Sequence, residues 1–160
     1  MGAWRYRGVV QLNDREVYDK YAAELCRFAS TLVGPTDADD VVSSVFVRVI
    51  ASGALAGVDN QRAYLFRAVL NEARSNHRSA TRRLEREAAL ATSGLDEDRP
   101  ADADLFRALG QLTVRQRAVL WLAYWIDAPV VEIASTLDLS KRTVERALQI
   151  ARQRLEEELS

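Results

Sequence analysis

The chain has 160 residues and a formal net charge of −1, which suits one domain or two small helical ones and excludes a protein that is polycationic throughout. Only three prolines and seven glycines interrupt the sequence, and no useful strand-like alternation occurs, so we expect an all-α fold. No apolar run is long enough to span a bilayer, and residues 1–12 lack the apolar centre of a secretory signal; this excludes a membrane protein and indicates a cytoplasmic one.

Three helices are expected in a first domain, residues 14–91, which follows a loose leader of residues 1–13. The first helix begins at Asp14, carries apolar residues at three-and-four spacing and ends at Gly34-Pro35. The single cysteine, Cys26, lies on its apolar side. This position favours core packing in a reducing compartment over a disulfide or a metal cluster.

The second and third helices carry opposite charge. Acidic residues occupy the first turn of the second helix, where the helix dipole favours them, and we expect Thr36 or Asp37 to cap it. A flexible connection from Ser52 to Asn60 leads to the third helix, which opens at Gln61. The third helix and the residues after it have many arginines and few acids, which favours a phosphate-facing surface over a merely solvated one. The arginines of this segment are Arg62, Arg67, Arg74, Arg78, Arg82, Arg83 and Arg86.

Composition changes at Thr92, where an acidic stretch with Gly94 and Pro100 begins and little can be buried. We therefore expect residues 92–104 to be an acidic linker and residues 105–160 to be a second helical domain.

This second domain contains a local signal for the start of a helix. Thr113 and Gln116 predict a capping box. The aromatic residues that follow are expected in core or rim packing rather than in a base-stacking platform. These residues are Trp121, Tyr124 and Trp125.

Two helices meeting at an angle are predicted in the last third of the chain. Helical apolar spacing runs from Val130 to Leu137 and resumes after a break, where Ser140 can cap the next helix through the backbone N–H of Thr143. The second of these helices then begins with two cations at 141 and 142. A capped, cationic helix braced by another is typical of a helix-turn-helix; an ordinary helical hairpin with charges facing water is the alternative.

No set of residues for catalysis can be assembled from the sequence. His77 is the only histidine and lies among arginines, where a surface position near phosphate is favoured over general-base chemistry. The acids Asp37, Asp39 and Asp40 are explained by a helix first turn without a metal, and no glycine-rich phosphate loop is present. We expect no enzyme, no cofactor and no metal site.

Several motifs, taken in order, resemble those of bacterial sigma factors of the extracytoplasmic-function (ECF) group, sigma-70 family, which keep only sigma regions two and four. Residues 37–49 (DADDVVSSVFVRV) are similar to the helix that docks on the clamp of RNA polymerase, and residues 62–71 (RAYLFRAVLN) to the helix after it. Residues 112–120 (LTVRQRAVL), Glu132-Ile133-Ala134 and Thr143-Val144 resemble the entry and the helix-turn-helix of region four. The resemblance covers about residues 14–159.

The resemblance implies a transcription initiation factor that binds core RNA polymerase, reads two promoter elements and helps open the duplex. It also implies an anti-sigma partner. For the minus-ten element it implicates Tyr64, Arg67, Asn71, Arg74 and Arg78. For the minus-thirty-five element it implicates Ser140, Lys141, Arg142, Glu145, Arg146 and Gln149. For polymerase binding it implicates Asp40, Val41, Ser44, Val45 and Arg48.

Two departures from the family pattern support a second hypothesis, a sigma-like regulator that binds a partner protein or a signal ligand and lacks full initiation activity. Ser43-Ser44 stands where the family has Gln and an acid. The family also commonly has basic residues at the positions of Glu145, Ala147 and Ile150. The partner-binding surface of such a regulator would include Leu148, Ile150 and either Trp121 or Trp125.

Overall fold

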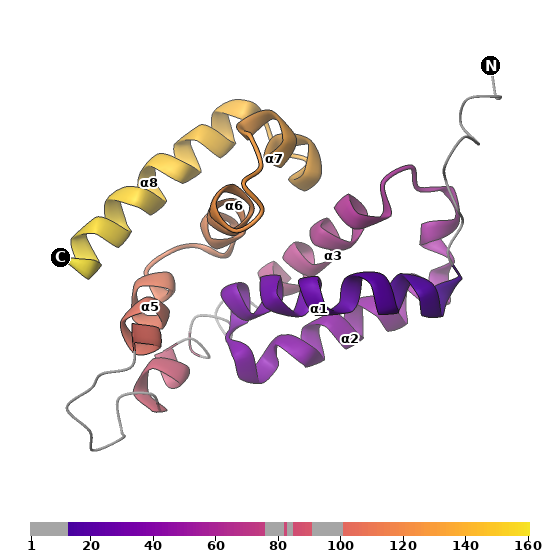
Figure 1. Cartoon of the computed structure of the whole chain (residues 1–160), viewed down its shortest axis with the longest axis horizontal. Helices are drawn as coiled ribbons and strands as arrows, with labels where there is room; N and C mark the ends of the chain where they lie inside the picture. The colour runs from indigo at the N-terminus through magenta and orange to yellow at the C-terminus, as the bar shows by residue number, and fades with distance from the viewer. Residues whose placement is uncertain (1–12, 76–81, 83–84, 91–100) are drawn as a thin grey trace.

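The structure, a computed structural model, describes residues 13–75, 82, 85–90 and 101–160. Every regular element among these residues is helical, which confirms the all-α expectation (Figure 1). The expectations for the leader, for His77, Arg78 and Arg83, and for most of the acidic linker lie outside the described residues.

Helix α1 (Asp14–Val33) begins and ends on local signals. Asn13 and Glu16 form a capping box, and Gly34 ends the helix with a φ of 91°. Helix α2 (Pro35–Ser52) follows directly, with Gly34 as its N-cap and Pro35 in its first turn. The expectation that Thr36 or Asp37 caps α2 is therefore wrong. The Thr36 hydroxyl instead donates to the carboxylate of Glu87.

The connection between α2 and α3 is more ordered than expected. Gly53 ends α2 in the left-handed region, with a φ of 64°. A short 3-10 helix, η1 (Ala54–Gly57), follows and buries Leu55 against the core. The side chain of Asn60 accepts from the backbone N–H of Ala63 and so satisfies the start of α3 (Gln61–Ser75).

A second group contains α5 (Ala101–Gly110), α6 (Val114–Tyr124), α7 (Val130–Leu137) and α8 (Lys141–Leu159). The predicted capping box at the start of α6 is present, and Ser140 accepts from the backbone N–H of Thr143 at the start of α8, as expected. Helix α5 begins four residues before the expected start of the second domain, and its Ala103 is fully buried. The domain boundary itself stays a prediction, because residues 91–100 lie outside the described part of the chain.

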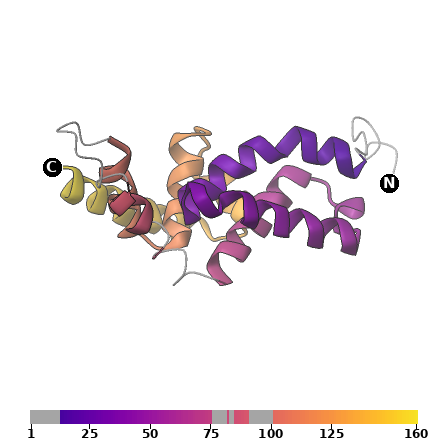
Figure 2. The ribbon, with the colours of Figure 1, turned by 90° about the horizontal axis from the view of Figure 1, so that it is seen from below.

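The two helical groups are packed against each other. Helix α6 contacts α1 and α3, and α7 contacts α3, so one apolar core extends through both groups. Figure 2 shows α1–α3 at one end of the molecule, α5 and α8 at the other, and α6 between them. The two helical domains expected from the sequence are present and also touch each other: Phe28 of α1 and Trp121 of α6 lie 5.1 Å apart between ring centroids.

Candidate nucleic-acid interface

An open groove of about 520 Å³ lies between α2 and α3. It brings together one residue from the set implicated in polymerase binding and three from the minus-ten set. Its lining combines cations, hydroxyls, an amide and a single carboxylate, a mixture that suits a nucleotide better than an apolar ligand. The groove is lined by Arg48, Val49, Ser52, Tyr64, Arg67, Ala68, Asn71, Glu72 and Ser75.

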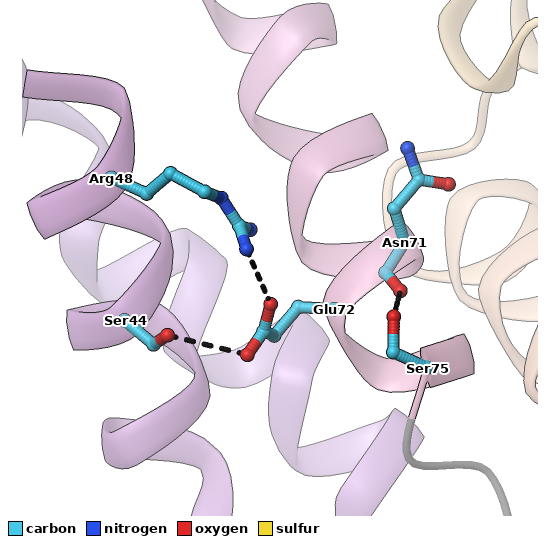
Figure 3. A network of polar contacts seen from close by, with 5 residues as sticks. All are labelled: Ser44, Arg48, Asn71, Glu72 and Ser75. Carbon is cyan, nitrogen blue, oxygen red and sulfur yellow. Dashed lines mark hydrogen bonds and ion pairs between the residues drawn. The ribbon is translucent and has the colours of Figure 1, made fainter. Parts of the chain in front are cut away.

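The carboxylate of the groove, Glu72, is held by two residues of α2 (Figure 3). Ser44 Oγ donates to its Oε1 at 3.2 Å, and Arg48 Nη1 donates to its Oε2 at 2.9 Å. Glu72 is only 19% exposed whereas Arg48 is 57% exposed, so the guanidinium reaches from the surface into the groove. The sequence analysis did not single out Glu72.

The residues implicated in minus-ten recognition are spread along one side of α3. Tyr64 and Arg67 are half-buried in the groove, and Asn71 is exposed with its side chain directed away from Glu72 (Figure 3). The Nε of Arg67 is buried and has no hydrogen-bond partner within the described residues. Arg74 is exposed on the same helix but does not line the groove, and Arg78 lies outside the described residues.

The residues implicated in polymerase binding divide between the surface and the core. Asp40, Ser44 and Arg48 are exposed on α2. Val41 and Val45 are 7% and 0% exposed and pack in the core, so they support the helix and present no contact surface. We therefore withdraw both valines from the expected polymerase contact.

Helix α8 presents a polar face that is accessible from solvent. The residues implicated in minus-thirty-five recognition are all exposed, whereas Val144, Ala147 and Leu148 on the opposite side of the helix are buried. Lys141 and Glu145 form an exposed i, i+4 pair with 4.0 Å between Nζ and Oε1. The exposed face consists of Ser140, Lys141, Arg142, Glu145, Arg146 and Gln149.

The burial pattern also affects the partner-binding surface of the second hypothesis. Leu148 and Trp121 are buried, and Ile150 is half-buried, whereas Trp125 is 63% exposed. Only Trp125 of that surface is therefore broadly available. Ala147 lies in the core, so its departure from a basic residue does not alter the exposed face.

A buried cation, Arg117, was missed in the sequence analysis. Its side chain is fully buried, and burial lowers the pKa of its guanidinium to about 10. A usable signal was present, because Arg117 falls on the apolar stripe of α6 between Val114 and Trp121, where a solvent-facing cation does not belong.

Nothing in the described residues points to a metal centre or a membrane helix. Among them, no three His, Cys, Asp or Glu side chains are grouped so that they could hold a metal ion. No helix of this part of the chain is both long and apolar enough to cross a bilayer.

Comparison with known proteins agrees with this geometry. The family described as Sigma-70 region 2 matches residues 17–83, and the family described as Sigma-70, region 4 matches residues 102–155. The first match includes the α2–α3 groove, and the second includes the exposed face of α8.

Relatives with similar sequences cover most of the chain. The ECF RNA polymerase sigma factor SigL of Mycobacterium tuberculosis is 31% identical over 150 residues, which are 86% of this chain and 83% of that protein. The RNA polymerase sigma-E factor of Streptomyces avermitilis is 33% identical over 144 residues, with 84% and 78% covered. The fold is that of the sigma factor RpoE of Bartonella quintana in its co-crystal structure with the anti-sigma factor NepR, with a TM-score of 0.64, 22% identity and 91% and 95% of the two chains covered. The chain thus belongs to the sigma-70 family, in its extracytoplasmic-function group of RNA polymerase sigma factors.

Proposed function

We propose that the chain is a promoter-specificity subunit that binds core RNA polymerase through α2, holds bases of the minus-ten element on α3 and reads the minus-thirty-five element with α8. The observation that carries the proposal is the α8 face: a helix with a capped start turns six polar residues to solvent while its opposite side is buried. Such a helix enters a major groove without unfolding its own domain. Because core RNA polymerase acts in the cytoplasm, the proposed activity is cytoplasmic as well.

The α3 surface is suited to opened DNA rather than to a duplex. Arg67 and Arg74 provide charge for the sugar-phosphate backbone, and Tyr64 provides a ring against which a base stacks. The amide of Asn71 offers both a donor and an acceptor to the edge of an unpaired base. Because unpaired bases occur only after strand separation, this surface favours the open form of the promoter.

The α8 face is suited to base pairs in a duplex. Arg142 and Arg146 can each donate two hydrogen bonds to guanine, Gln149 matches adenine, and Glu145 accepts from the amino group of cytosine. The Glu145 carboxylate lowers the general attraction for phosphate, so recognition by this helix depends more on base identity than it would with a cation at 145.

On α2 the exposed Asp40, Ser44 and Arg48 form the proposed contact with polymerase. Ser44 carries no charge, and its hydroxyl donates to the carboxylate of Glu72 of α3. An anti-sigma factor is a further proposed partner: the structural neighbour RpoE was solved with one, and the same α2 and α8 surfaces are accessible in this chain.

Transcription in vitro with purified core RNA polymerase tests the proposal. Genomic fragments are transcribed with core alone, with core plus the chain, and with core plus a chain that carries Asn71→Ala and Arg146→Ala together. We expect specific start sites only with the unmodified chain. Core binding without transcription from any fragment, or no binding to core at all, would contradict the proposal.

A further inference from the structure

The exposed polar face of α8 continues beyond Gln149. Arg152 lies seven residues after Glu145, which is two helical turns with a mismatch of only about 20°, and both residues are exposed. Arg154 belongs to another side of the helix, because its Nη1 donates to the main-chain carbonyl of Gln111 at 2.6 Å. Arg152 therefore shares the side of α8 that carries Glu145 and adds a cation to it.

A tyrosine of another helix holds Arg152. The Nε of Arg152 donates to the hydroxyl of Tyr124, at the end of α6, with 2.5 Å between Nε and Oη. The guanidinium carbon of Arg152 also lies 5.6 Å from the centroid of the Tyr124 ring. These two contacts hold the guanidinium against the ring and restrict the long arginine side chain. Tyr124 is 61% exposed, so the two residues meet at the surface and not in the core.

The contacts with Tyr124 leave most of the Arg152 guanidinium available. Only its Nε is used, and within the described part of the chain neither Nη1 nor Nη2 has a hydrogen-bond partner. The four N–H groups on these two atoms lie in one plane, and a phosphate can accept two of them at once. The two residues thus present an oriented cation whose donors suit a phosphate.

The position of Arg152 along α8 indicates which part of a duplex it meets. Ten residues separate Arg142 from Arg152, which is about 15 Å along the helix axis. A major groove is about 12 Å wide, so when the start of α8 lies among base edges, Arg152 lies at the border of the groove beside the sugar-phosphate backbone. The exposed acids that follow repel phosphate, so the contact ends within about one turn of Arg152. These acids are Glu156, Glu157 and Glu158.

We propose that Arg152 and Tyr124 form a phosphate-binding pair that fixes α8 on the backbone of the upstream duplex. Arg152 makes the contact, and Tyr124 is a positioning residue that acts through Arg152. The Arg152–Tyr124 pair rests on the proposed assignment of α8 to the minus-thirty-five element. It contributes affinity and orientation without base preference, because a phosphate contact carries no direct sequence information.

Substitutions in the full chain test the Arg152–Tyr124 pair. Arg152→Ala removes the cation, whereas Arg152→Lys keeps the charge and loses the planar fork. Tyr124→Phe removes only the hydroxyl and is made both alone and together with Arg152→Ala. The matched control is Arg154→Ala, which also removes one exposed cation and one hydrogen bond of α8. Unfolding followed by circular dichroism verifies that every chain is folded.

Each chain is assembled with core polymerase and titrated at several salt concentrations with the shortest duplex that the wild-type complex retains from genomic fragments. We expect Arg152→Ala to lower the affinity about tenfold and to reduce the slope of log affinity against log salt by about 0.9. Discrimination against substituted duplexes should not change. Arg152→Lys should keep the slope of the wild type, and Arg154→Ala should match the wild type in affinity and slope.

Tyr124→Phe distinguishes a positioning residue from an independent contact. We expect it to lower the affinity about threefold in the wild-type chain and to have no effect in the Arg152→Ala chain, because the two residues are coupled. An Arg152→Ala complex with the salt slope of the wild type, or a Tyr124→Phe effect that persists without Arg152, would overturn the Arg152–Tyr124 pair.

Binding to core polymerase without DNA is measured for the same chains. An equal loss of affinity for core in Arg152→Ala would mean that Arg152 contacts protein, and it would overturn the phosphate contact. A wild-type complex that retains no duplex at all would overturn the proposed function, and the Arg152–Tyr124 pair with it. That result differs from a retained duplex whose binding ignores Arg152, which would overturn the pair alone.

Discussion

Arg48 of α2 and Glu72 of α3 form an ion pair, with 2.9 Å between Nη1 and Oε2, at the boundary between the proposed polymerase surface and the proposed DNA groove. The pair links the two helices at the point where both surfaces meet. Arg48 is more than half exposed, so solvent screens the pair and its contribution to folding is small.

Removing Arg48 is therefore expected to affect binding more than stability. For Arg48→Ala we expect a loss of at most about 1 kcal/mol in the free energy of unfolding, measured by urea denaturation. Affinity for core polymerase should fall by about tenfold, because a charged hydrogen-bond donor is lost from the contact. Arg15→Ala, which removes an exposed arginine of α1, is the control. Equal affinities of the two variants would contradict the assignment of Arg48.

Asn71→Ala is expected to impair promoter opening more than duplex binding. The amide of Asn71 is assigned to an unpaired base, and a good contact of this kind contributes about 1–3 kcal/mol. Permanganate reactivity of minus-ten thymines measures opening, and mobility shift on duplex measures binding. Gln153→Ala removes an exposed amide from the later part of α8 and should leave both unchanged. A parallel loss of opening and of duplex binding by Asn71→Ala would argue against the assignment.

Arg146→Ala is expected to weaken binding to a duplex that contains only the upstream element. If Arg146 contacts a base, discrimination at one base pair should relax by about 1–3 kcal/mol; a phosphate contact would instead lower the salt slope by about 0.9. A titration of cognate and substituted duplexes at several salt concentrations distinguishes the two. Lys20→Ala, an exposed cation of α1, should change neither quantity. If Arg146→Ala changes neither the base-pair discrimination nor the salt slope, Arg146 is not part of the DNA interface.

Ser140→Ala is expected to lower the free energy of unfolding by about 1 kcal/mol, because Ser140 Oγ accepts from the backbone N–H of Thr143 at 3.1 Å. Thermal or urea unfolding followed by circular dichroism measures the loss. Ser160→Ala, at the opposite end of α8, makes the same chemical change outside the N-cap and should have little effect. Equal stabilities of the two variants would contradict the capping role.

Cys26 is expected to react slowly with iodoacetamide until strongly alkaline pH. Burial, and after it the nearby Asp39, whose Oδ1 lies 3.3 Å from Sγ, together raise the pKa of its thiol from 9.0 to about 11. Between pH 9 and 11 the folded chain holds this proton more tightly than the unfolded chain, so the stability contributed by the protonated thiol is lost as pH rises through that window.

The rate of alkylation against pH measures this pKa directly, because the chain has no other cysteine. The urea-unfolded chain is the control and should show a midpoint near 9, whereas the folded chain should show one near 11. Asp39→Asn should lower the folded midpoint. A folded midpoint at or below that of the unfolded chain would contradict the described environment of the thiol.

Local sequence determined the helices and most of their ends. The box formed by Thr113 and Gln116 and the cap formed by Ser140 each act over three residues, so the sequence alone predicts them. The exposed face of α8 also follows from helical spacing. The predicted cap of α2 failed for a local reason that spacing does not reveal: proline at the first helical position lets Gly34 serve as the N-cap.

Tertiary structure alone decided which polar residues are buried and which distant residues meet. Ser44 and Glu72 are 28 residues apart, and Leu32 and Arg117 are 85 apart, so helical periodicity carries no information on either contact. Periodicity places Val41 and Val45 on one helix face but does not say whether core or partner covers it. Helix α6 packs on α1 and α3 and covers apolar faces that appear in the sequence as separate stripes. The hydrophobic effect is not directional, so the sequence pattern does not say which apolar faces pack together, and only the assembled shape decides this.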